Sequence, residues 1–151
     1  MKLYLVRHGE AVQAEADRER VLTAMGRQRV AKTAAFLQDN DITAEIIYHS
    51  GKTRALETAR IIAGAINPLR GLEEAKGLGP NDPINPWAEK SSRFKYDTMI
   101  VGHLPYLSKF ASLLLTGSED RDIFKIFDAS VICLEYSGGW SVLWFVTPDI
   151  I

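Results

Sequence analysis

The stretch LYLVRHGE, residues 3–10, joins a short apolar run to an abrupt change in polarity. Residues 3–6 are all apolar, which is typical of a strand buried on both faces of a parallel sheet. Arg7, His8, Gly9 and Glu10 follow without a break. In an open parallel sheet, the ligand crevice lies at the carboxyl ends of the strands. The stretch therefore predicts an α/β protein with a polar site directly after its first strand.

Two further apolar runs, at residues 46–48 and 98–101, indicate strands. A helical pattern lies before the first of these runs. Thr23 is its expected N-cap and the helix is expected to reach about Asn40. Its buried face is predicted by apolar and small residues at helical spacing, namely Gly26, Val30, Ala34 and Leu37.

Two more helices are expected after the second and third strands. Ser50 is the predicted N-cap of the second helix, which Pro68 ends. Pro105 suits the first turn of the third, and Gly117 suits its C-terminal stop. The apolar stripes are Ala55, Ala59, Ile62 and Ile66 in the second helix and Leu107, Phe110, Ala111 and Leu114 in the third.

Residues 67–95 are rich in glycine and proline and predict a long functional loop, with a short helix near Trp87. Residues 130–136 and 141–146 are β-rich and flank Gly138 and Gly139, which indicates a hairpin. The whole pattern predicts one domain over residues 1–151. Its expected fold is a three-layer α/β/α sandwich, with a mostly parallel sheet and a C-terminal β-hairpin.

Composition narrows the function classes. The 151 residues carry 18 Lys and Arg against 19 Asp and Glu, a net charge of −1, so no global basic field attracts nucleic acid or an anionic membrane. Cys133 is the only cysteine, so it is expected to be a buried apolar residue. No apolar run approaches the ~18 residues that a membrane helix needs. We expect a cytoplasmic location.

Polar residues gather after each of the three strands, and the parallel sheet is expected to bring them to one edge. These residues include His8, Arg54 and His103. Lys52 and Arg54 lie near the positive end of the second helix dipole, which is unfavourable for cations unless an anion binds there. Two histidines and two arginines favour an anion site over a metal site. Solvent exposure of the two cations is the alternative explanation.

These segments resemble the motifs of the histidine phosphatase superfamily, the phosphoglycerate-mutase-like group. Residues 5–11 (LVRHGEA) are similar to its Arg-His-Gly signature, and residues 22–26 (LTAMG) to its Leu-Thr-x-x-Gly stretch. Residues 50–59 (SGKTRALETA) resemble its Ser-Pro-x-x-Arg-Ala-x-x-Thr-Ala segment, with Gly51 in place of proline. Residues 102–105 (GHLP) resemble its second histidine motif, and the short chain looks most like the SixA-type phosphohistidine phosphatase branch.

The resemblance implies a role for each matching residue. His8 would be the nucleophile and form a phosphohistidine intermediate, attacking as the neutral imidazole. Neighbouring arginines would lower its pKa and keep it neutral. Arg7, Arg54 and His103 would bind the phosphoryl oxygens, and no metal or other cofactor would be required.

The general acid is the point of departure from the family. Many members carry a glutamate that protonates the leaving oxygen, whereas here Glu73, Glu74 and Asp82 are weak candidates that read as solvated surface carboxylates. An imidazole leaves more readily than an alkoxide. The expected partner is therefore a phosphorylated protein bearing phosphohistidine, with a small phosphate ester as the other possible substrate.

Two alternative functions stay open at this stage. One is a small-molecule phosphomonoesterase, and the other is a phosphate-dependent binding module without turnover. The presence of His8, Arg7, Arg54 and His103 disfavours the binding module. Arg18 and Arg20 lie in a charged loop near the site. They are interpreted as a solvated face, with substrate contact by one of them as the alternative.

Overall fold

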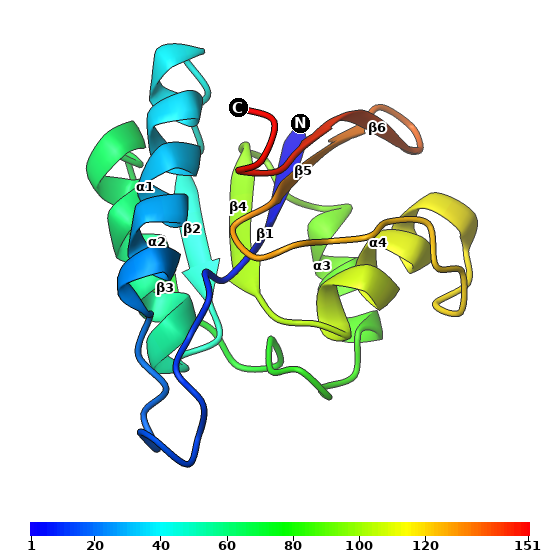
Figure 1. Ribbon diagram of the computed structural model, residues 1–151. Helices are drawn as coiled ribbons and strands as arrows, with labels where there is room; N and C mark the ends of the chain where they lie inside the picture. The colour runs from blue at the N-terminus through cyan, green and yellow to red at the C-terminus, as the bar shows by residue number, and fades with distance from the viewer.

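The structure is a computed structural model that describes residues 1–151. Six strands form one sheet in the order β3-β2-β4-β1-β5-β6 (Figure 1). The strands are β1 (Lys2–Arg7), β2 (Ile46–His49), β3 (Leu72–Glu74), β4 (Thr98–Gly102), β5 (Val131–Tyr136) and β6 (Trp140–Val146). The helices are α1 (Ala24–Asp39), α2 (Thr53–Ile66), α3 (Asn85–Ser91) and α4 (Tyr106–Thr116).

The helices cover both faces of the sheet, with α1 and α2 on one side and α3 and α4 on the other (Figure 1). Successive side chains of a strand point to opposite faces. Tyr4 and Val6 of β1 accordingly pack with α1 and α2, while Leu3 and Leu5 pack with α3 and α4. This confirms the predicted three-layer sandwich and explains why residues 3–6 are continuously apolar.

The four strands β3, β2, β4 and β1 are parallel, whereas β5 runs antiparallel to β1 and forms a hairpin with β6. The predicted mostly parallel sheet and C-terminal hairpin are therefore confirmed. Cys133 of β5 is fully buried, as expected.

The first helix begins as predicted, and the second does not. The Thr23 hydroxyl accepts a hydrogen bond of 2.9 Å from the Gly26 N–H, which caps α1. The prediction that Ser50 caps α2 is wrong. Lys52 is the N-cap and provides no side-chain hydrogen bond, because the chain makes one further turn after β2 and carries Ser50 to His103 instead.

The other predicted ends are close to those observed. Helix α2 ends at Ile66 with Asn67 in the left-handed conformation, so Pro68 follows the cap. Pro105 is the N-cap of α4 rather than a residue of its first turn, and Gly117 caps the other end with a φ of 76°. The residues predicted for the buried faces of α1 and α2 are all buried.

Residues 67–95 contain more regular structure than the sequence suggests. The short helix near Trp87 is confirmed as α3, and the Trp87 indole N–H donates to the Lys76 carbonyl at 3.0 Å. Strand β3 was not predicted. It is only three residues long and has one apolar residue, so it carries no periodic signal, and its pairing with β2 alone defines it. No helix of the protein is long and apolar enough to span a membrane.

Candidate active site

The predicted site residues meet because β4 lies between β1 and β2. Arg7 ends β1 and lies opposite Gly102, the last residue of β4. His49 ends β2 and lies opposite Val101. The backbone N–H of His8 donates to the Gly102 carbonyl at 3.1 Å, which ties the first loop to the third. The segments after β1, β2 and β4 therefore converge at one edge of the sheet, as the sequence predicted.

The His8 ring is held between a carbonyl and a guanidinium. Nδ1 lies 2.7 Å from the Gly9 carbonyl, which can only accept, so Nδ1 carries the proton. Nε2 accepts a hydrogen bond of 3.2 Å from Arg54 Nε. Burial, followed by the charges of Arg54, Arg7 and Arg20, lowers the pKa of His8 to about 4, against the opposing effect of the Gly9 carbonyl. At neutral pH the ring is an uncharged imidazole with its Nε2 lone pair facing Arg54.

His103 lies beside His8, with 5.0 Å between the ring centroids. The ring is 1% exposed, and its Nε2 is 2.5 Å from the Ser50 hydroxyl oxygen. Burial and the nearby positive groups lower the pKa of His103 to about 3. Its Nδ1 is buried and has no hydrogen-bond partner. An unpartnered buried nitrogen is costly, and here it belongs to a ring that faces the site.

The two predicted arginines differ in their partners. Arg7 donates from Nη1 to the Ile126 carbonyl at 2.7 Å and pairs through Nη2 with the Asp128 carboxylate at 2.8 Å. Its Nε is buried with no partner. Arg54 is 9% exposed and forms no ion pair with a carboxylate. Arg54 thus contributes a positive charge that no protein anion neutralises.

Close packing explains the glycine after His8. A Cβ on Gly9 would lie 2.6 Å from Cγ2 of Val30, so only glycine lets this loop rest against α1. The Gly9 N–H donates to the Thr58 hydroxyl at 3.0 Å, and that hydroxyl donates to the Arg54 carbonyl at 2.8 Å. Thr58 therefore connects the His8 loop to the turn of α2 that carries Arg54.

The candidate carboxylates lie at the edge of the site. Glu74 and Asp82 line an open cavity of about 570 Å³ together with Ser50, and Glu74 Oε1 lies directly over Gly51. Asp82 accepts a hydrogen bond of 2.7 Å from the Gly79 N–H. The charge of Glu73 acts on Tyr48 instead. All three residues are exposed, and no three His, Cys, Asp or Glu side chains form a group that could hold a metal.

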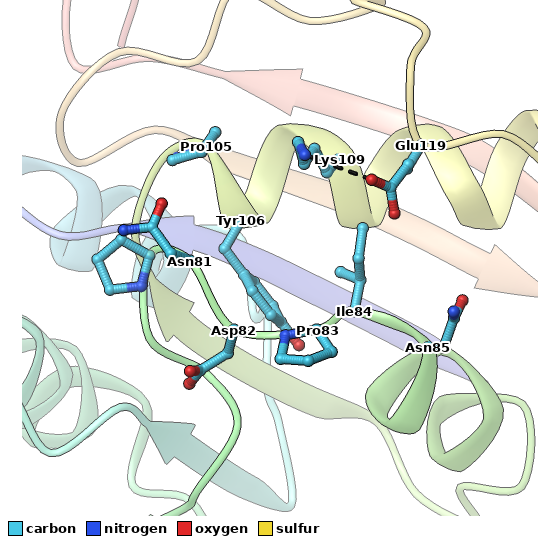
Figure 2. A pocket seen from close by; sticks show the side chains of 10 residues that line it. Asn81, Asp82, Pro83, Ile84, Asn85, Pro105, Tyr106, Lys109 and Glu119 are labelled. Atoms are coloured by element: carbon cyan, nitrogen blue, oxygen red, sulfur yellow. Dashed lines mark hydrogen bonds and ion pairs between the residues drawn. The ribbon is translucent and has the colours of Figure 1, made fainter.

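Two further cavities adjoin the site. Figure 2 shows one of about 280 Å³ at the start of α4, which is lined by Asn81, Asp82 and Tyr106 and where Lys109 pairs with Glu119. The other, of about 330 Å³, is bounded by Arg7 and residues 124–127. None of the three cavities, including the one beside Ser50, is lined by His8, Arg54 or His103. They therefore flank the histidine pair rather than contain it.

The structure adds partners that the sequence did not reveal. Ser50 was interpreted as a helix cap and Thr58 only as part of a motif, while Asp128 was not considered. Asp128 lies 121 residues from Arg7 in sequence, and no local pattern links the two. The only local signal for Ser50 was its position directly after a strand, next to other polar residues.

Comparison with known proteins identifies the class. A model of the histidine phosphatase superfamily (branch 1) matches residues 3–78, half of the chain, and the chain belongs to this family. Membership of this family, together with relatives that are phosphatases, supports a hydrolase of phosphate esters.

Individual relatives are more distant. The chain is 27% identical over 101 residues to the mitochondrial serine/threonine-protein phosphatase PGAM5 of Mus musculus, a match that covers 63% of this chain and 35% of that protein. The chain thus spans about a third of the length of this curated relative.

Solved structures confirm the fold over the whole length. The protein histidine phosphatase SixA in complex with tungstate has a TM-score of 0.88 and 19% identity, with 99% of this chain and 98% of that chain covered. A SixA described as a putative phosphohistidine phosphatase, from Agrobacterium tumefaciens, has a TM-score of 0.80 and 18% identity, with 97% of each chain covered.

Proposed function

We propose that this protein is a phosphatase that works through a covalent phosphohistidine at His8. The observation that carries the proposal is the state of the His8 ring. Its Nδ1 proton is bound by the Gly9 carbonyl, and burial among arginines keeps the ring neutral. A neutral imidazole with a fixed tautomer and a lone pair on Nε2 is a nucleophile at neutral pH.

The reaction has two displacements at phosphorus. In the first, Nε2 of His8 forms a bond to phosphorus while the bond to the leaving group breaks, and the leaving group takes a proton from solvent. In the second, water attacks phosphorus, the P–N bond to His8 breaks, and inorganic phosphate is released with the neutral ring restored. Both transition states place negative charge on the three equatorial oxygens.

Arg7, Arg54 and His103 are the proposed donors to those oxygens. Arg7 Nε is buried without a partner, so a phosphoryl oxygen would satisfy it. In the resting site, the Nε–H of Arg54 donates to the lone pair on His8 Nε2. This N–H must move to a phosphoryl oxygen when the substrate enters. The Ser50 hydroxyl orients the His103 ring. Each such donor is worth roughly 10²–10³ in rate in comparable sites.

We propose a phosphohistidine protein as the substrate. Glu73, Glu74 and Asp82 are exposed, and Asp82 already accepts from the Gly79 N–H, so none of these three candidate carboxylates is buried in the site to act as the acid. Imidazole is a better leaving group than an alkoxide. The open cavity beside Ser50 suits a side chain presented by another protein. A cytoplasmic location remains a prediction from the sequence.

The test follows phosphate on the protein. After mixing with a phosphohistidine-bearing domain, rapid quench should trap acid-labile, base-stable phosphate on the wild type and none on His8→Ala. His49→Asn is the matched control, because His49 is buried and the hydrogen bond of its ring goes to the Gly51 N–H rather than to His8, Arg54 or His103. A wild type that never becomes labelled while it releases phosphate would exclude the covalent route. Equal kcat/KM on an alkyl phosphate would favour a small-ester substrate.

A further inference from the structure

The strap formed by residues 11–22 follows β1 and extends beyond the carboxyl edge of the sheet, on the side of α1 and α2 (Figure 1). Its two ends are joined by the bridge between Ala11 and Leu22 and by a hydrogen bond of 2.9 Å from the Val12 N–H to the Val21 carbonyl. Arg20 lies in the second arm with a φ of 51°, and its Nε donates to the Val12 carbonyl at 3.0 Å. This hydrogen bond fixes the Arg20 side chain across the strap. The two terminal nitrogens of its guanidinium, Nη1 and Nη2, stay available to bind another group.

A second contact docks the strap onto α2. The Thr53 hydroxyl donates to the Glu19 carboxylate at 2.8 Å. Thr53 is the first residue of α2 and directly precedes Arg54. The contact thus places the Glu19–Arg20 pair of the strap next to the turn that carries Arg54. Glu19 is occupied by the hydroxyl and forms no ion pair with either arginine.

The charge balance of the site is incomplete without Arg20. Asp128 neutralises Arg7, and both histidines are neutral at pH 7, so Arg54 is the only uncompensated charge among the four predicted residues. A phosphoryl group carries close to two negative charges at this pH. Arg20 is half-buried and has no carboxylate partner. Two unpaired guanidinium groups held close together are unfavourable unless an anion lies between them.

We propose that Arg20 is a third guanidinium of the phosphoryl site and binds a non-bridging phosphoryl oxygen opposite Arg54. This inference rests on the proposed function for its substrate and adds a residue outside the four predicted ones. Guanidinium suits the role because its terminal N–H groups can contact oxygen while Nε stays bound to the Val12 carbonyl. The charge of Arg20 also helps to lower the pKa of His8, Arg54 and His103, in keeping with its proximity to all three.

The experiment compares Arg20→Gln and Arg20→Lys with Arg18→Gln. Arg18 is exposed, lies on the same strap two residues away, and serves as the matched control. Inorganic tungstate is the tetrahedral oxyanion probe, with binding measured by calorimetry and inhibition measured against an aryl phosphate. We expect Arg20→Gln to weaken tungstate binding and kcat/KM by roughly 10- to 100-fold, as for a lost hydrogen bond between charged groups. Arg20→Lys should recover part of this loss, and Arg18→Gln should stay within about twofold of the wild type.

Several outcomes would overturn the inference. Wild-type tungstate affinity in Arg20→Gln would overturn it, and so would equal losses in the Gln and Lys variants with lowered melting temperatures, which would indicate a purely structural strap. Because tungstate binding is measured separately from hydrolysis, a failure of the inference about Arg20 can be told apart from a failure of the proposed function. A wild type that binds tungstate through Arg20 but never hydrolyses phosphate refutes only the function. A wild type that hydrolyses phosphate with Arg20→Gln unchanged refutes only the inference.

Discussion

Arg54 Nε donates a hydrogen bond of 3.2 Å to Nε2 of His8, the ring nitrogen that the Gly9 carbonyl leaves unprotonated. This hydrogen bond orients the His8 ring, the proposed nucleophile, and at the same time occupies the lone pair with which Nε2 would attack. A phosphoryl group that attracts the guanidinium would release that lone pair at the moment of attack. The resting site is therefore organised around an exchange of one hydrogen bond.

Arg54→Lys tests this exchange. Lysine keeps the positive charge but cannot place a planar N–H both at His8 and at a phosphoryl oxygen. We expect kcat with an aryl phosphate to fall by roughly 100-fold or more, in the range for loss of one oxyanion donor. Arg60→Lys, an exposed change on the same helix, should leave kcat unchanged. A fully active Arg54→Lys enzyme would mean that a positive charge at position 54 is sufficient for turnover and that the planar guanidinium is not needed.

The pH dependence of stability tests the burial of the two neutral imidazoles. The pKa values of His8 and His103 are about 4 and about 3 in the folded chain, against 6.5 for an exposed histidine. Between pH 6.5 and 4 the unfolded chain thus binds more protons than the folded chain, and the free energy of unfolding must fall as the pH falls through this window. Calorimetric melting of the wild type and of a double variant, His8→Asn with His103→Asn, measures the effect. The variant should lose less of its Tm between pH 7 and 5, and a parallel decline would contradict the assignment.

Gly9→Ala tests the close contact between the His8 loop and α1. The new methyl group would lie 2.6 Å from Cγ2 of Val30 and 3.1 Å from the Gly26 carbonyl oxygen. Overpacking of this kind costs about 1–3 kcal/mol of unfolding free energy. Gly64→Ala is the control, because no atom lies within 4 Å of its Cβ position on α2, and it should stabilise by roughly 0.5–1 kcal/mol. Urea titrations measure the unfolding free energy of both variants. Equal values for Gly9→Ala and Gly64→Ala would refute the close contact between the His8 loop and α1.

Ser50→Ala tests the orientation of His103. Removing the hydroxyl leaves His103 Nε2 without its 2.5 Å partner in a ring whose Nδ1 is already unpartnered. A lost hydrogen bond of about 1 kcal/mol predicts a roughly fivefold lower kcat with an aryl phosphate. Ser50→Thr retains the hydroxyl and should restore most of the activity. If alanine and threonine behave alike, the hydroxyl has no role in turnover.

The mostly parallel sheet and the gathering of Arg7, His8, Arg54 and His103 were predictable from the sequence. Apolar runs followed at once by polar residues mark the carboxyl ends of parallel strands, and that edge is shared by all of them. The buried faces of the helices were also predictable, because apolar residues at helical spacing mark one face of a helix. Val30 in α1 and Ile62 in α2 belong to such faces, and both are buried. Strand β3 escaped prediction because three residues with one apolar side chain carry no period.

Ser50 shows where local rules stop. Directly after a strand, a serine is a good helix cap by propensity, but two more residues precede α2 and the hydroxyl reaches His103 instead. The pairing of the site's arginines with carboxylates was also not predictable from the sequence. Asp128 neutralises Arg7 from the far end of the chain, and only the docking of the strap on Thr53 gives Arg20 its place.

The layered fold, the family motifs and the four residues at the sheet edge could be predicted from residue patterns, because periodicity and short motifs are properties of neighbouring residues. Three other properties became visible in the folded chain: which ring nitrogen of His8 is unprotonated, how far the pKa of His8 falls, and which arginines have no carboxylate partner. Those properties depend on burial and on contacts between segments far apart in the chain, and hydrogen bonding and electrostatics act over distances in space rather than along the sequence.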